Sequence, residues 1–196
     1  CGDGGALIAN NDLDFKKAKK LKWFGYDRDA SKDENGNWKA QQEEADIEEN
    51  DVGYKFNMNN ISAGIGLSNI PKIRQLVDKH IENAEIYNNH FYNDNKIKPL
   101  KKVKGSKCVY WVYTLLLDPT IDKDNLIKNL NKHGISSGPV HIPNDEYSCF
   151  KRFKDDLPGV RQFSKRQLNL PCGWWLEKND IDFIANKLKN LIYKNY

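Results

Sequence analysis

The sequence predicts a small α+β domain, preceded by a long helix and a polar segment rich in loops. Apolar residues recur at helical spacing through residues 71–92. Within residues 108–117 apolar side chains alternate in a way that is typical of a strand. From residue 100 to residue 196 the expected strands and helices are mixed in a pattern that favours a small α+β domain, and we expect its sheet to be antiparallel.

The bulk composition limits the classes of protein that this chain can represent. Its 196 residues, 39% hydrophobic, are enough for one domain or two small ones. The net charge of +4 comes from lysines nearly balanced by acids, so we expect no nucleic-acid partner. Apolar runs stay well below the ~20 residues of a membrane span. Four scattered cysteines without metal-ligand spacing favour a cytoplasmic protein with reduced thiols and no metal.

The first quarter of the chain predicts one strand and one helix. Residues 5–9 follow a glycine-rich turn and are expected to be extended. Asn11 or Asp12 is expected to cap a helix over residues 12–23. Its lysines at 16, 17, 19 and 20 indicate a solvated face more than a phosphate site. Residues 25–52 show no period and predict a long loop, either functional or disordered.

The next elements lead into the small domain. Residues 54–57 are expected to be extended, with Asn59 or Asn60 capping a helix that ends near residue 69. Pro71 opens a second helix that runs to about residue 92. Beyond it we expect strands over 100–103, 108–117, 135–140 and 168–170, and helices over 121–133, 146–153, 159–167 and 178–194.

Several catalytic motifs are absent from the sequence. The glycine-rich turn at residues 2–5 is not followed by the Lys-Ser/Thr pair of a phosphate-binding loop. It precedes a strand, whereas dinucleotide-binding glycines follow one. Neither a GxSxG nor an HExxH sequence occurs. A site with a cysteine–histidine nucleophile pair remains an alternative, although no spacing in the sequence supports it.

Two segments carry candidate site residues, and the long loop 25–52 is a third candidate. Lys55 and Asn57 share one side of an extended stretch just before a helix N-terminus, which suits a phosphate. The alternative is that Lys55 is an ordinary surface lysine and that Asn57 caps the helix. His141 follows a strand in a loop with Pro139 and Pro143, which suits a ligand contact or, equally, an exposed turn.

Five motifs in order resemble the C-terminal half of the DegT/StrS family of pyridoxal-phosphate-dependent nucleotide-sugar aminotransferases. The chain reads GDGGALIAN, KAKKLKWFGYDR, GYKFNMNNISAGIGLSNIPKI, HGISSGPVHIP and LNLPCGWWLEKNDIDFI. The third resembles the family pattern GY[NK]Y[RN][ML] followed by [ST][DE]-I-x-A-A-x-G-L. The fourth resembles its Gly-Ile…Val-His-x-x-Pro segment. The similarity spans nearly the whole chain.

The resemblance implies a fold type I transferase in which this chain supplies the C-terminal portion. The lysine that forms the aldimine with pyridoxal 5'-phosphate would lie just upstream of Cys1, so this chain would hold no catalytic residue. Residues 1–55 would be a remnant of the large cofactor domain, including the loop 25–52. Residues 56–93 would form an interface helix and a linker helix, and residues 94–196 the small domain.

The resemblance also implies shared active sites in a homodimer. Lys55, where many members have Asn, would bind the cofactor phosphate of the other subunit, with Asn57 close by. His141 matches the substrate-side histidine. Trp23 and Phe24 replace the usual Asn-His pair, so Arg28 is a candidate for the phosphates of the nucleotide sugar. Asn144 replaces a more common apolar residue and is a further substrate candidate.

The implied reaction is transamination of a nucleotide-linked keto-deoxysugar with glutamate as amino donor. A branch of the family without the lysine dehydrates instead. Alternatives are a non-catalytic module that binds sugar nucleotides or dimerises and, more weakly, a basic nucleic-acid-binding domain that uses lysines at 16–20 and 101–104.

Overall fold

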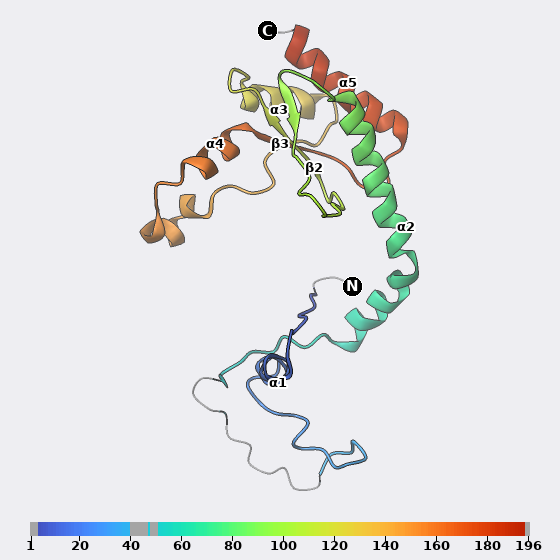
Figure 1. Cartoon of the computed structure of the whole chain (residues 1–196), viewed down its shortest axis with the longest axis vertical. Coiled ribbons are helices and arrows are strands. Elements are labelled where there is room, and N and C mark those ends of the chain that lie inside the picture. The colour runs from blue at the N-terminus through green and yellow to red at the C-terminus, as the bar shows by residue number, and fades with distance from the viewer. Residues whose placement is uncertain (1–3, 40–46, 48–50, 195–196) are drawn as a thin grey trace. The chain divides into compact units, whose positions relative to one another are not determined.

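The computed structural model describes residues 4–39, 47 and 51–194 (Figure 1). Contacts divide the chain into two units, Cys1–Pro71 and Lys72–Tyr196. The division into 1–55, 56–93 and 94–196 stays a prediction, and residues 2 and 3 of the glycine turn and most of 40–50 lie outside the described residues. Among the residues described, no helix is both long and apolar enough to cross a membrane.

The first unit contains helix α1, Asp12–Leu21, as expected. Asn11 caps it, because its side-chain oxygen accepts a hydrogen bond from the Asp14 N–H at 2.9 Å. The prediction of a strand over residues 5–9 was wrong. These residues pair with no strand within the described part of the chain, and Leu7 and Ile8 lie 79% and 89% exposed.

Helix α2 spans Asn60–His90 without a break, where two helices were expected. Asn59 is the cap, since its Oδ1 accepts from the Ser62 N–H at 2.8 Å. Pro71 lies inside the helix and has no N–H to donate to the Leu67 carbonyl. The helix therefore loses one hydrogen bond there, yet its turns continue on both sides.

The second unit is built on a three-stranded antiparallel sheet with the order β1-β2-β3. Its strands are β1 Ile97–Pro99, β2 Tyr113–Leu117 and β3 Gln167–Leu170. Strand β2 alternates, with residues 113, 115 and 117 buried, as its pattern predicted. Asn169 of β3 also forms an isolated bridge with Gly138. The expected antiparallel sheet in a small α+β domain is therefore confirmed.

Three strand predictions in this unit differ from the structure. The first strand lies at 97–99 instead of 100–103, because it pairs with β2 residues 115–117. Strand β2 begins at Tyr113 instead of 108, since Tyr110 has a φ of 48°, which interrupts an extended backbone. Residues 135–140 contribute only the bridge at Gly138; Pro139, which follows it, has no N–H for a ladder.

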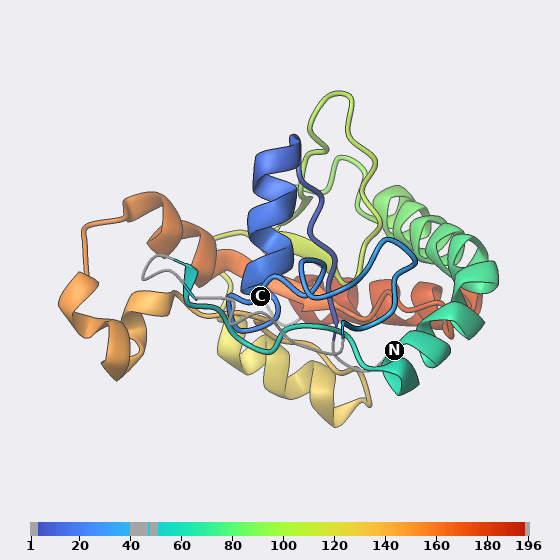
Figure 2. The same ribbon diagram turned by 90° about the horizontal axis from the view of Figure 1, so that it is seen from below.

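Three α-helices accompany the sheet: α3 Lys123–Lys132, α4 Pro158–Arg166 and α5 Lys178–Lys194, close to the expected ranges. Helices α3 and α5 bury side chains in the core, whereas α4 has no buried residue. The helical segment expected at 146–153 consists of two 3-10 helices, η2 Asn144–Glu146 and η3 Ser148–Phe153. The core gathers side chains from α2, α3, α5, β2 and β3. Figures 1 and 2 both show α4 and the 3-10 helices projecting on the side of the sheet away from α2.

Candidate functional site

A short antiparallel pairing fixes the backbone around Lys55. The N–H of Tyr54 donates to the Leu21 carbonyl at 3.0 Å, and that of Phe56 to the Lys22 carbonyl at 2.9 Å. Gly53 is needed for this approach, since a Cβ there would lie 2.2 Å from the Leu21 oxygen. The pairing sets Lys55 opposite Trp23, with which it forms an isolated bridge.

Lys55 and Asn57 both present unpaired polar groups. The Lys55 Nζ lies 4.8 Å from the centre of the Trp23 ring and forms no ion pair with any carboxylate that the structure describes. The Oδ1 of Asn57 is buried and has no hydrogen-bond partner in the described part of the chain. Asn59 takes the capping role, so capping does not account for Asn57. The two residues thus offer a cation and an amide next to the start of α2.

Arg28 lies beside the same indole as Lys55. Its Cζ is 4.4 Å from the centre of the Trp23 ring and 5.0 Å from that of Trp38. Lys32 also lies over Trp38, at 5.5 Å. The sequence indicates Arg28 and Lys55 as candidates but not their proximity, and nothing in it points to Lys32, Trp23 and Trp38 as their partners. No spacing rule reveals this, because a non-periodic loop brings the residues together.

Three of the four lysines of α1 are paired with carboxylates of the first unit. Lys17 and Lys20 lie 4.0 Å and 3.7 Å from Asp51, and Lys19 is hydrogen-bonded to Asp29. The Lys19 hydrogen bond lowers the pKa of the Asp29 carboxyl, mildly opposed by burial. These pairs fit the expected solvated helix face and leave little free charge for a phosphate.

In the second unit, His141 is exposed at the end of the 135–140 segment. Its carbonyl accepts a hydrogen bond from the Gln167 Nε2 at 2.9 Å, which holds the backbone, and no described residue is hydrogen-bonded to the imidazole. The ring centre lies 6.5 Å from that of Trp111. Asn144 is also exposed and opens η2.

Asp145, next to Asn144, has a structural partner. Both of its carboxylate oxygens accept hydrogen bonds from the Arg161 guanidinium. That hydrogen bonding lowers the pKa of Asp145. The pair ties η2 to α4 and so fixes the loop that carries Asn144.

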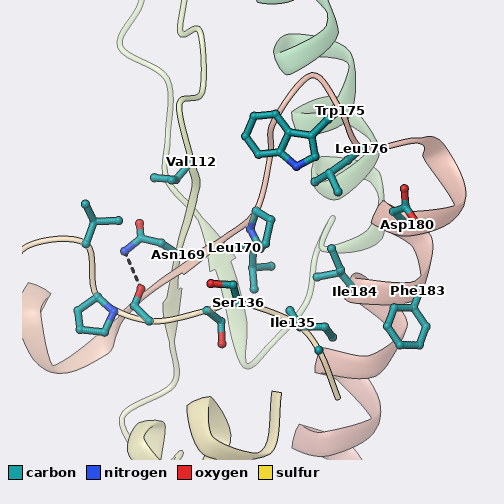
Figure 3. A pocket seen from close by; sticks show the side chains of 16 residues that line it. Val112, Ile135, Ser136, Asn169, Leu170, Trp175, Leu176, Asp180, Phe183 and Ile184 are labelled. Atoms are coloured by element: carbon teal, nitrogen blue, oxygen red, sulfur yellow. Dashed lines mark hydrogen bonds between the residues drawn. The ribbon is translucent and has the colours of Figure 1, made fainter. Parts of the chain in front are cut away.

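A cavity of about 680 Å³ lies beside the 135–140 segment in the second unit. Figure 3 shows Ile135 and Ser136 on one side, Phe183 and Ile184 from α5 on another, and Trp175 and Leu176 at one end. The lining also includes Val140, the residue before His141, but none of the predicted site residues. The wall is largely apolar.

Neither an activated cysteine nor a metal cluster stands out among the described residues. Burial raises the pKa of the Cys172 thiol to about 12, and its Sγ lies 3.4 Å from the His80 carbonyl oxygen, so it stays a buried thiol. No group of three or more His, Cys, Asp or Glu residues is placed to hold a metal within residues 4–39, 47 and 51–194.

Known proteins with similar sequences include enzymes whose names refer to nucleotide-linked amino sugars. GDP-perosamine synthase of Vibrio cholerae is 24% identical over 96% of this chain and 48% of its own length. A transaminase from Campylobacter jejuni, named for UDP-4-amino-4,6-dideoxy-N-acetyl-beta-L-altrosamine, is 23% identical over 98% of this chain and 49% of its own. An uncharacterised protein of Methanocaldococcus jannaschii, MJ1066, is 28% identical over 99% of this chain and 51% of its own. The chain thus spans about half the length of these relatives.

Solved structures show the same relationship. The sugar aminotransferase CalS13 from Micromonospora echinospora matches 91% of this chain and 45% of its own, with a TM-score of 0.76 and 27% identity. Helicobacter pylori PseC, an aminotransferase of pseudoaminic acid biosynthesis, matches 95% of this chain and 48% of its own, with a TM-score of 0.75 and 22% identity. The model of the DegT/DnrJ/EryC1/StrS aminotransferase family matches residues 1–189. The chain therefore belongs to the DegT/DnrJ/EryC1/StrS aminotransferase family.

Proposed function

We propose that the protein carrying this chain is a pyridoxal-phosphate-dependent aminotransferase that transfers the amino group of glutamate to a nucleotide-linked keto-deoxysugar. Family membership and the names of the related sugar aminotransferases support the reaction class. The observation that carries the proposal is the pair formed by Lys55 and Asn57. It places a cation that has no ion pair among the described residues, together with a side-chain amide, beside the start of α2.

These residues suit the phosphate of the cofactor. Lys55 is exposed and unpaired among the described residues, so its ammonium group can donate to phosphate oxygens. The Asn57 amide can donate through its nitrogen and is not used by the helix cap. When bound, pyridoxal phosphate supplies an aldehyde that takes up the amino group and a conjugated ring that accepts electrons.

The remaining site residues are assigned to the substrate. We expect His141 to orient the sugar through its free imidazole, with Asn144 nearby as a hydrogen-bonding side chain on the loop held by Asp145 and Arg161. Arg28 is assigned to the phosphates of the nucleotide. The proposed assembly is a homodimer, in which Lys55 serves the cofactor of the other subunit, and sedimentation of the holoenzyme tests that state.

The alternatives differ in what they predict for the same preparation. A non-catalytic module would bind the nucleotide sugar without changing it. A dehydratase would consume the sugar without incorporating nitrogen. Nucleic-acid binding is disfavoured by the pairing of Lys17, Lys19 and Lys20 with Asp29 and Asp51.

The test uses the full-length protein that carries this sequence, loaded with pyridoxal phosphate. Incubation with glutamate and a UDP- or GDP-linked 4-keto-6-deoxyhexose is expected to give an amino sugar, detected by mass spectrometry with nitrogen-15 glutamate. Lys55→Ala is expected to weaken cofactor binding by about 10-fold to 100-fold, the usual loss for a charge-assisted hydrogen bond. Lys72→Ala, on the exposed face of α2, is the matched control.

Two results would contradict the proposal. The first is a sugar product without the labelled nitrogen. The second is a Lys55→Ala protein whose cofactor affinity equals that of the wild type, which would remove Lys55 from the cofactor site. Lys55→Asn introduces a side chain that many family members carry at this position. It is expected to recover part of the cofactor affinity that Lys55→Ala loses.

A further inference from the structure

The connection between β1 and β2 is strongly basic. Residues 95–117 contain six lysines and no aspartate or glutamate. Four of these lysines lie within residues 100–107, which we call the basic loop: Lys101, Lys102, Lys104 and Lys107. Every residue of the basic loop is exposed, and Figure 2 shows this connection as a yellow-green loop that projects from the second unit. None of its residues is assigned to the cofactor or to the substrate.

A tight turn shapes the middle of the basic loop. The N–H and the Oγ of Ser106 both donate to the Val103 carbonyl, at 3.0 Å and 2.7 Å. Gly105 has a φ of 81°, a left-handed conformation that glycine adopts without a steric penalty in such a turn. Behind the turn, the His80 Nδ1 lies 2.8 Å from the Tyr110 carbonyl oxygen, a hydrogen bond that ties the connection to α2. The turn is therefore presented outward on an anchored base.

The acids of α2 neutralise the basic loop only in part. Lys101 and Lys104 form no ion pair with any described residue. The other two lysines do have partners on α2: Lys102 lies 2.5 Å from Glu85, and Lys107 lies 3.6 Å from Asp78. Both of these pairs are solvent-exposed, so each contributes little to stability and leaves its lysine able to exchange partners. The loop thus keeps a net positive charge at its surface.

Exposed aliphatic side chains lie between the lysines. Val103, in the turn, is 75% exposed, and Leu100, just before the first lysine of the loop, is 45% exposed. The interface of an anionic bilayer accommodates both kinds of side chain, because its headgroups attract lysines while its acyl boundary takes up aliphatic groups. A nucleic acid would use the lysines alone, since residues 100–107 contain no aromatic ring on which bases could stack. The combination therefore favours a lipid surface.

We propose that the basic loop is a docking surface for an anionic lipid bilayer. Its lysines contact the negatively charged headgroups, and Val103 and Leu100 enter the interface between them. Each lysine near such a surface raises the affinity about 5-fold, so a single loop of this size binds weakly and reversibly. The proposal goes beyond the aminotransferase reaction and does not depend on it, because the loop lies outside the residues assigned to that reaction.

The first test measures co-sedimentation of the full-length protein with lipid vesicles. Vesicles of phosphatidylcholine alone are compared with vesicles of phosphatidylcholine and phosphatidylglycerol. The protein is expected to bind the anionic vesicles only, and its affinity is expected to fall as the salt concentration rises, because salt screens the attraction between exposed charges. Equal binding to both kinds of vesicle, or binding to neither, overturns the proposal.

The second test locates the contact in the basic loop. Lys101→Ala combined with Lys104→Ala is expected to weaken binding to anionic vesicles by about 10-fold to 30-fold. Replacing the same two lysines by arginine keeps the charge and is expected to keep the affinity. Val103→Ser is expected to weaken binding by about 3-fold to 10-fold at low and at high salt, since it removes an apolar contact.

The matched control removes the same charge from another part of the second unit. Lys128→Ala combined with Lys132→Ala changes two exposed lysines of α3, and this variant is expected to bind anionic vesicles like the wild type. If the Lys101 and Lys104 alanine variant binds like the wild type, or if the α3 variant loses as much affinity, the loop is not the contact and the proposal is overturned.

Two further measurements separate docking from nucleic-acid binding and from catalysis. DNA oligonucleotides are added as competitors; if the protein binds them more tightly than anionic vesicles, and the alanine variant loses that binding, the loop is a nucleic-acid surface and the proposal is overturned. The rate of amino transfer in solution is expected to be the same in the loop variants and the wild type. If vesicle binding depends on the loop while the wild type transfers no amino group, the docking surface stands and the aminotransferase assignment fails.

Discussion

Asn83 offers a sharp test of what holds α2 against the segment after β3. This side chain is fully buried, and its Nδ2 donates to the Gly173 carbonyl at 2.9 Å and to the Leu176 carbonyl at 3.3 Å. Its Oδ1 has no hydrogen-bond partner in the described part of the chain. The amide therefore acts as a donor that ties α2 to two backbone carbonyls of this segment.

Two substitutions at position 83 separate the effect of lost side-chain volume from the effect of lost hydrogen-bond donation. Asn83→Ala removes both hydrogen bonds and opens a small cavity, so we expect a loss of about 2–4 kcal/mol in the free energy of unfolding. Asn83→Asp keeps the shape, but at neutral pH it sets a buried carboxylate against two carbonyl oxygens. We expect Asn83→Asp to lower the free energy of unfolding more than Asn83→Ala does, by roughly 3–5 kcal/mol.

The pH dependence follows from the sign of the pKa change. Burial without a donor raises the pKa of the introduced carboxyl in the folded state above its unfolded value of about 3.9. The folded state therefore accommodates this carboxyl best in its protonated form, and the deficit of Asn83→Asp grows as the pH rises above the unfolded value. The assay is urea unfolding followed by circular dichroism at pH 4 and pH 7, with Asn89→Asp on the exposed face of α2 as control.

The reasoning is refuted if Asn83→Asp is no more destabilising than Asn83→Ala at pH 7. It is also refuted if the deficit of Asn83→Asp relative to the wild type is the same at both pH values. Either result would mean that donation from Nδ2 does not hold this contact.

Three further predictions concern the second unit. Leu115→Ala, at a fully buried position of the central strand β2, is expected to cost about 2–5 kcal/mol in urea unfolding. Gly173→Ala would set a Cβ 2.3 Å from the Trp175 ring; because that ring can swing outward, we expect a changed tryptophan fluorescence with a stability loss of only about 1 kcal/mol. Arg161 lowers the pKa of Asp145, so the pair is lost as the pH falls through that pKa, and Arg161→Gln is expected to raise the Asp145 pKa in an NMR titration.

Local sequence signals predicted the helices better than the strands. Capping residues and apolar spacing located α1, α3 and α5 within a few residues, because these signals act within one or two turns. Strands depend on partners that lie far away in the chain. Residues 5–9 have an apolar pattern but no partner in the described structure, whereas residues 97–99 pair with β2 despite a weak pattern.

The amino-acid sequence alone indicated the family and most of the helices, and it indicated candidate site residues at Lys55, Asn57, Arg28, His141 and Asn144. Ordered motifs and capping chemistry carry that information within short stretches of chain. The three-dimensional structure was needed to show that Trp23 lies beside both Arg28 and Lys55. It also showed that Asn59 caps α2, whereas the Asn57 Oδ1 has no hydrogen-bond partner among the described residues. The physical reason is that these contacts depend on backbone pairing between residues 21–24 and 54–56, which are separated by a loop without any period.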